Sequence, residues 1–238
     1  MTELAQRSIA SRIWERALNV LFPPRCVSCN DFGAFICASC VAQMTTADPP
    51  RCPVCWMPSR ESQCGRCRLR RTGVSGTRSV FIYEYEGVAR DAIYALKFRG
   101  LSAIAPGMSS LMAKLLIEWG PPVQAIVPVP LSGRRRRSRG YDQSELLARE
   151  IARLTGIPLA RRALVRRRST VPQTHQAGEE ARRRNVAGAF GPGGCMPIGG
   201  VLLIDDVVTT GATLDACARV LISEGGGPVF ALTFARVD

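Results

Sequence analysis

The residues with the clearest chemical potential lie in one short segment, residues 201–213, which reads VLLIDDVVTTGAT. Its aliphatic residues predict a buried strand, and Asp205 and Asp206 follow at the carboxyl end. A loop of small residues then leads into a predicted helix, where backbone N–H groups and the helix dipole can hold a phosphate. The two carboxylates can accept hydrogen bonds from sugar hydroxyls or stabilise a developing cation. The segment therefore predicts a site for a ribose 5-phosphate, with these residues around the phosphate: Thr209, Thr210, Gly211, Ala212 and Thr213.

Other nucleotide-binding motifs with a similar strand do not fit the sequence. A Walker B strand needs a GxxxxGK[ST] loop elsewhere, and neither Lys97 nor Lys114 follows a glycine. A dinucleotide fingerprint needs GxGxxG after an early strand, and a receiver-type acidic pocket needs a lysine late in the chain; the sequence has neither. The remaining alternative is a strand whose polar end only caps the next helix, which the TTGAT sequence disfavours.

A second group with metal-binding potential is formed by eight of the ten cysteines, which lie in four CxxC pairs. Two such pairs supply the four thiolates of a tetrahedral zinc site that is closed and structural. Neighbouring pairs can form two ribbons in tandem, or alternate pairs can interleave, and the spacing does not decide between them. Disulfides, redox motifs and an iron–sulfur cluster are the alternatives. Zinc deaminase chemistry is excluded, because the single histidine, His175, lies far downstream. The predicted zinc ligands are Cys26, Cys29, Cys37, Cys40, Cys52, Cys55, Cys64 and Cys67.

The charge of the chain is unevenly distributed. The net charge is +13, and residues 134–184 hold 15 arginines against 5 acidic residues. This asymmetry favours a polyanionic partner, although 30 of the 32 basic residues are arginine, a bias that a GC-rich genome also produces. The run RRRRSR at 134–139 has three interpretations: a track for single-stranded DNA, a pyrophosphate ligand, or a solvated loop. Tyr141 is the only aromatic residue between 120 and 189, so this part of the sequence lacks the usual platform for base stacking.

The elements that must position these residues alternate along the chain. Strands are predicted over 78–85, 124–130, 201–205 and 228–235, and helices over 87–99, 106–119, 143–155 and 211–223. This order predicts an α/β fold with a mostly parallel sheet and helices on both faces, in which ligands lie beyond the carboxyl ends of the strands.

Before the cysteines, residues 3–21 show helical periodicity. They predict an amphipathic helix that caps the zinc module, or alternatively lies on a membrane surface. We therefore expect three units: an N-terminal amphipathic helix (1–22), a double zinc ribbon (23–75) and an α/β domain (76–238). No stretch approaches the about 20 apolar residues of a membrane span, and the first thirty residues lack the apolar centre of a secretory signal. We expect the protein in the cytoplasm.

The sequence resembles a known family at several places. Residues 201–213 resemble the phosphoribosyl pyrophosphate (PRPP) motif of type I phosphoribosyltransferases. Four CxxC pairs ahead of such a domain resemble the ComF family of competence proteins. Further segments agree with that family from residue 21 onward: FPPRCVSC, YEG…LKFRG, VPVPLS…RGYDQSELLA and RRRNVAGAF.

The resemblance implies a type I phosphoribosyltransferase fold preceded by a small zinc-ribbon module, in which four cysteines hold each of two structural zinc ions. It implies that Asp205 and Asp206 act in catalysis by contacting the ribose of PRPP, directly or through magnesium. Thr209 to Thr213 would surround the 5-phosphate. The resemblance places the pyrophosphate loop at residues 130–133, including Ser132, with Arg139 and Lys97 as further pyrophosphate ligands.

The resemblance also implies a function linked to DNA uptake. We expect phosphoribosyl transfer to an unknown acceptor, or alternatively a non-catalytic PRPP sensor and single-stranded-DNA-binding scaffold that works with DNA-uptake proteins. Two departures are visible. Thr209 stands where some purine-salvage relatives carry an acid, which disfavours hypoxanthine or guanine as acceptor. The family usually reads RGFNQ where this chain has RGYDQ, with Tyr141 and Asp142.

Overall fold

The computed structural model describes residues 23–70, 72–167, 186 and 188–238. The predicted N-terminal helix over 3–21, His175 and the arginines at 168 and 182–184 lie outside these residues. Among the described helices, none has the length and apolar composition needed to cross a membrane.

A four-stranded parallel sheet forms the centre of the molecule. Its order is β1 (Val74–Ile82), β6 (Val229–Arg236), β5 (Val201–Val208) and β2 (Ala125–Pro128). The strands are rich in aliphatic residues on both faces, which is typical of parallel strands that helices cover on both sides. The α/β class predicted from the alternating pattern is therefore confirmed.

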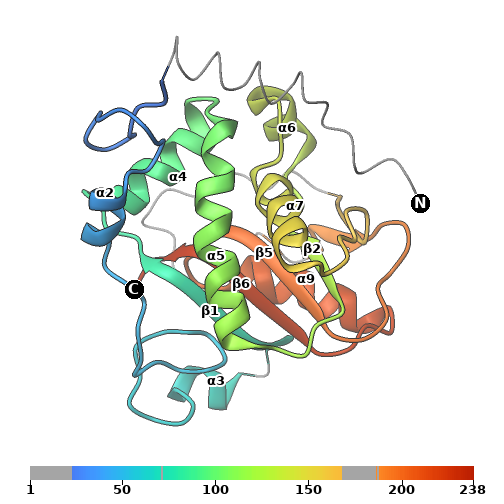
Figure 1. Ribbon diagram of the computed structural model, residues 1–238. Coiled ribbons are helices and arrows are strands. Elements are labelled where there is room, and N and C mark those ends of the chain that lie inside the picture. Colours follow the sequence, from blue (N-terminus) through green and yellow to red (C-terminus); the bar gives the residue numbers. More distant parts are fainter. Residues whose placement is uncertain (1–22, 71, 168–185, 187) are drawn as a thin grey trace.

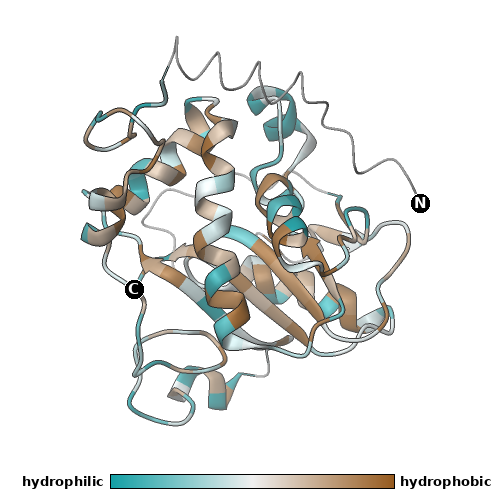
Figure 2. Cartoon of the chain, in the orientation of Figure 1, coloured by the Kyte–Doolittle hydropathy of each residue, from teal (hydrophilic) through white to brown (hydrophobic). Residues whose placement is uncertain are grey.

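Helices cover the two faces of the sheet unequally. On one face lie α4 (Val88–Phe98), α5 (Ala105–Trp119) and α7 (Gln143–Thr155), and on the other lies α9 (Ala212–Ser223) (Figure 1). Side chains of β5 alternate between two hydrophobic clusters, because successive residues of a strand point to opposite faces. Leu202 and Ile204 pack with the first group of helices, whereas Val201 and Leu203 pack with α9. The central strands are coloured mainly as hydrophobic residues in Figure 2.

Smaller elements complete the fold. They are α2 (Ala38–Gln43), α3 (Gly65–Leu69), the 3-10 helix η1 (Ser102–Ile104), α6 (Gly133–Arg139) and an antiparallel pair formed by β3 (Leu164–Arg166) and β4 (Phe190–Pro192). The helix α6 is the arginine run that hydrophobic periodicity could not reveal, because it has no buried residue. Ser132 caps its amino end by accepting a hydrogen bond from the Arg135 backbone N–H, and Gly140 ends it in a left-handed conformation.

The cysteine-rich module covers the free edge of β1. The Ala47 N–H donates to the Val80 carbonyl, and the Ile82 N–H donates to the Thr45 carbonyl. Further along the same strand, the Thr77 N–H donates to the Pro53 carbonyl. An uncovered edge strand offers unpaired backbone groups to other chains, so this packing protects the sheet while it fixes the module on it.

Candidate functional site

The two consecutive aspartates lie within the last four residues of β5, the second strand from one edge of the sheet. The strand continues to Val208, three residues beyond the predicted end at 205, because it pairs with β6 up to that point. The Asp206 side chain is only 3% exposed, and its Oδ2 lies 2.6 Å from the Lys97 Nζ of α4. Asp205 Oδ1 accepts hydrogen bonds from the Ser144 hydroxyl (2.8 Å) and the Asp206 backbone N–H (2.9 Å).

The surroundings of this acid pair change its protonation. Burial, followed by the neighbouring Asp206 carboxylate, raises the pKa of Asp205 to about 8, and the Lys97 ammonium group opposes the shift only in part. Asp205 is therefore mainly protonated at neutral pH. Within the described chain, no hydrogen bond of favourable geometry reaches Asp206 Oδ2, although Lys97 forms an ion pair with it. That oxygen retains capacity for a polar ligand.

A cleft of about 220 Å³ opens above the acid pair. Its walls come from α4, the loop after β2, α6, α7, β3 and the junction of β5 with α9. Arg139 of α6 lines it and donates to the Gln143 side-chain oxygen at 2.9 Å. The polar and charged side chains of the cleft are Lys97, Arg135, Arg139, Gln143, Ser144, Arg166, Asp205, Asp206 and Thr213.

The small-residue loop after β5 separates this cleft from a second pocket. Thr213 lines the acidic cleft, whereas Thr209, Thr210 and Gly211 line a pocket against the cysteine-rich module. Gly211 is the N-cap of α9 with a φ of 77°, a left-handed conformation that favours glycine. Ala212, the first residue of α9, is buried.

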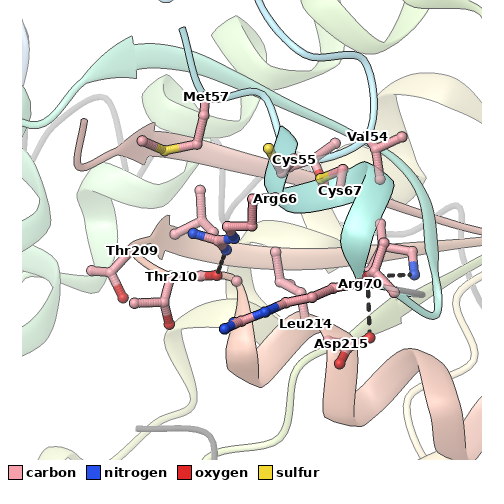
Figure 3. Close-up of a pocket in the computed structure, with 15 residues that line it drawn as sticks. Val54, Cys55, Met57, Arg66, Cys67, Arg70, Thr209, Thr210, Leu214 and Asp215 are labelled. Atoms are coloured by element: carbon pink, nitrogen blue, oxygen red, sulfur yellow. Dashed lines mark hydrogen bonds between the residues drawn. The ribbon is translucent and has the colours of Figure 1, made fainter. Parts of the chain in front are cut away.

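The second pocket is small, and its lining includes Arg66 of α3 and Arg70, which follows that helix. Figure 3 shows Arg66 pointing toward the Thr210 carbonyl, to which it donates a hydrogen bond. On the same side, Asp215 of α9 accepts from the Gly73 N–H (2.6 Å) and from the Thr72 hydroxyl (3.1 Å). The loop predicted to hold a phosphate is thus in contact with the cysteine-rich module, which the sequence did not indicate.

Asp142 is a helix-capping residue whose role the sequence left open. Its side chain caps α7 by accepting from the backbone N–H groups of Ser144 and Glu145, and it also accepts from the Leu131 N–H at 2.8 Å. It therefore ties the loop at residues 130–133 to α7. Ser132 belongs to that loop, and the structure places it as the buried cap of α6 rather than among the residues lining the cleft. The Asp142-to-Glu145 spacing is the capping pattern that could have revealed this role.

The eight clustered cysteines form two groups, which settles their pairing. Neighbouring CxxC pairs come together, and within each group the sulfur atoms lie within 4.8 Å of one another. Zinc–sulfur bonds of about 2.3 Å in a tetrahedron require sulfur separations of about 3.8 Å. The Cys29 and Cys37 sulfurs are 3.5 Å apart, those of Cys55 and Cys64 are 3.6 Å apart, and none of the eight is in a disulfide. The donor sets therefore fit two structural zinc ions.

The second of these groups is fixed to the sheet by charged side chains. Arg236, at the end of β6, is fully buried and donates to the Cys55 carbonyl (2.8 Å) and to the Asp238 carboxylate (2.6 Å). Arg51 binds the same carboxylate with two hydrogen bonds of 2.9 and 2.8 Å. These arginines lower the pKa of Asp238 against the effect of its partial burial.

Comparisons with known proteins agree with these features. Residues 17–68 match the double zinc ribbon domain family. The DNA utilization protein YhgH of Escherichia coli K12 is 32% identical over 82% of this chain and 87% of its own length. Competence protein ComFC of Bacillus subtilis is 27% identical (80% and 79% of the two chains), and competence protein F of Haemophilus influenzae is 29% identical (78% and 83%).

Among solved structures, the crystal structure of TT1426 from Thermus thermophilus aligns with 55% of this chain and 74% of its own, at 18% identity and a TM-score of 0.33. This likeness is too partial to support a conclusion. The sequence matches instead establish the family, because they span most of both chains. The chain belongs to the ComF family, which includes these competence and DNA utilization proteins.

Proposed function

We propose that the acidic cleft binds PRPP and that the protein transfers its phosphoribosyl group to an acceptor. The observation that carries this proposal is the adjacent carboxylates of the partly buried Asp205 and the buried Asp206 at the carboxyl end of β5, in one cleft with Lys97, Arg139 and Thr213. Ligands of parallel α/β sheets bind beyond the carboxyl ends of the strands. The cleft thus offers acids for ribose hydroxyls and cations for a pyrophosphate within about 220 Å³.

Magnesium fits the residues of this cleft. Mg²⁺ is held in proteins by one or two carboxylates together with substrate phosphates, and Asp205 and Asp206 are the carboxylates available here. Asp206 Oδ2 has no well-oriented hydrogen bond in the described chain. When bound, the ion would neutralise charge on the pyrophosphate leaving group.

The chain's own residues would act on the bond that breaks. The acceptor forms a bond to the anomeric carbon, the bond from that carbon to the pyrophosphate oxygen breaks, and the acceptor loses a proton. Positive charge develops on the sugar ring, and an ionised carboxylate beneath it stabilises this charge. Arg139 and Lys97 would bind the departing pyrophosphate, for which a guanidinium group has the matching fork of donors.

We propose a role in DNA uptake or use for this activity, since the relatives are named as competence and DNA utilization proteins. A second candidate is a PRPP sensor that binds single-stranded DNA without transfer. The arginine helix α6 favours it, because Arg134, Arg136 and Arg137 are exposed to solvent next to the cleft.

A turnover experiment separates these functions. PRPP labelled in its pyrophosphate group is incubated with the protein, magnesium and a cell extract, and the labelled pyrophosphate released beyond that from the extract alone is measured. We expect release that depends on the extract and is lost in Asp205→Asn/Asp206→Asn, while the control Asp91→Asn, a partly exposed acid of α4, retains it. Binding of PRPP without release indicates the sensor, and neither binding nor release contradicts both functions.

A further inference from the structure

Two exposed aromatic side chains lie beside the arginine helix, although they come from another part of the sequence. Tyr94 is 42% exposed and Phe98 is 64% exposed, and both belong to α4. The buried face of α4 is made by other residues, so these rings contribute little to the core. Their ring centroids are 5.1 Å apart with an interplanar angle of 43°. They form an aromatic pair on the surface, with one helical turn between them.

Arginine side chains surround this pair. The guanidinium carbons of Arg90 and Arg99 lie 5.7 and 5.4 Å from the centre of the Tyr94 ring, and that of Arg139 lies 5.0 Å from the centre of the Phe98 ring. Arg139 belongs to α6, so the pair is joined directly to the helix that carries RRRRSR. The hydroxyl of Tyr141 holds the two regions together by donating to the Leu96 carbonyl of α4 at 2.5 Å.

The surface formed by Tyr94, Phe98, Arg90, Arg99 and Arg139 is continuous with the acidic cleft. Arg139 lines the cleft, and Lys97, the neighbour of Phe98, forms the ion pair with Asp206 inside it. Figures 1 and 2 show α4 and the strongly hydrophilic α6 at the same end of the molecule. An extended anionic chain lying on this surface would therefore have one end near the cleft.

We propose that Tyr94 and Phe98 are a base-stacking platform for single-stranded nucleic acid, with the phosphates bound by the arginines of α6 and α4. Proteins that bind single strands combine a positively charged groove with aromatic rings on which bases stack. The charge of the surface matches a phosphate backbone, and the rings distinguish it from a site for any polyanion. A duplex fits it poorly, since its bases are already stacked on one another. This inference deepens the proposed role in DNA use and rests on it.

Two polymers of equal length separate stacking from charge. The first is a labelled dT20 oligonucleotide, and the second is an abasic deoxyribose–phosphate chain with the same label. Binding of each is measured by fluorescence anisotropy over a range of salt concentrations. We expect the wild type to bind dT20 more tightly, because one stacked base contributes about a fivefold or larger increase in affinity.

Variants of the platform then test the assignment. Tyr94→Leu/Phe98→Leu is expected to weaken dT20 binding at least about fivefold, with no change for the abasic chain or in the salt dependence, and Phe98→Trp is expected to bind dT20 as well as the wild type does. Arg134→Gln/Arg137→Gln is expected to weaken both polymers and to reduce the salt slope by about 1.4, at about 0.7 for each phosphate contact. Phe32→Leu is the matched control, since Phe32 is 59% exposed under Arg25 in the first ribbon.

Each contrary result has a distinct meaning. Equal binding of dT20 and the abasic chain by the wild type overturns the platform but leaves DNA binding intact, as does dT20 binding that the leucine variants do not weaken. Competition by polyglutamate as strong as competition by unlabelled dT20 also overturns it. If the wild type binds neither polymer, the DNA part of the proposed function fails together with this inference.

Discussion

Asp205 and Asp206 are consecutive residues of one strand, yet their surroundings differ. Asp206 is paired with the Lys97 ammonium group. Among the described residues, the hydrogen bonds that Asp205 accepts come from neutral donors, the Ser144 hydroxyl and a backbone N–H. Burial and the adjacent negative charge therefore favour the protonated form of Asp205. A ligand that brings a divalent cation would reverse this preference and release the proton.

The raised pKa has a consequence for stability. The folded protein keeps a proton on Asp205 up to pH about 8, whereas the unfolded chain releases it near pH about 4. The folded state therefore loses stability relative to the unfolded state as the pH rises between these values, by up to about 1.4 kcal/mol per pH unit. Asp205→Asn removes this loss and retains an oxygen that can accept both hydrogen bonds.

We therefore predict that Asp205→Asn gains stability relative to the wild type as the pH rises from 5 to 8. The measurement is the free energy of unfolding in urea at each pH unit, with Asp91→Asn as the surface control. If the free energies of unfolding of variant and wild type differ by the same amount at every pH in this range, the protonated state of Asp205 is contradicted.

At the scale of elements, the site depends on the connection from β2 through α6 to α7. Asp142 fixes this connection, because its buried carboxylate caps α7 and also accepts a hydrogen bond from the Leu131 N–H in the loop before α6. Burial raises the pKa of Asp142, so a neutral side chain of the same shape should be tolerated.

Asp142→Ala is predicted to destabilise the protein by about 2 kcal/mol, because it removes a helix cap and leaves a backbone N–H without its partner. Asp142→Asn keeps an acceptor in place and is predicted to change stability by less than about 0.5 kcal/mol. Urea unfolding monitored by circular dichroism measures both. Equal losses in the two variants would show that charge, and not capping, is the contribution of Asp142.

The sequence predicted the long elements well, because buried strands and amphipathic helices have a pattern of hydrophobic residues that is visible in the sequence. It placed the end of β5 too early, because the pairing with β6 up to Val208 is a contact between distant residues. It did not predict α6, whose seven residues include no buried side chain. The pairing of the CxxC motifs and the approach of Arg139 to Phe98 depend on tertiary structure, so spacing alone could not establish either.

At the scale of the whole molecule, the zinc ribbons and the α/β domain form one packed unit. The second ribbon contacts the loop after β5 through Arg66, and it contacts the end of β6 through Arg236. The fully buried Arg236 depends on Asp238 for its neutralisation. Loosening of the second ribbon would therefore change the position of the loop at residues 209–213 and also lower the free energy of unfolding.

Asp238→Asn tests this connection. The change removes the charge that neutralises Arg236 and Arg51, and we predict a loss of about 1–3 kcal/mol in the free energy of unfolding. Glu86→Gln, at an exposed acid between β1 and α4, is the control and is predicted to leave stability nearly unchanged. Equal stability of the Asp238 variant and the wild type would show that the ribbon is held by its other contacts alone.

Binding of a sugar pyrophosphate by the acidic cleft is the central claim, and titration calorimetry of PRPP in the presence of magnesium tests it directly. We predict one site per chain at pH 8, with affinity falling by up to about tenfold at pH 7 and again at pH 6 as Asp205 takes up its proton, and no binding by Asp205→Asn/Asp206→Asn. Absence of binding heat for both PRPP and ribose 5-phosphate at every pH would contradict the central claim.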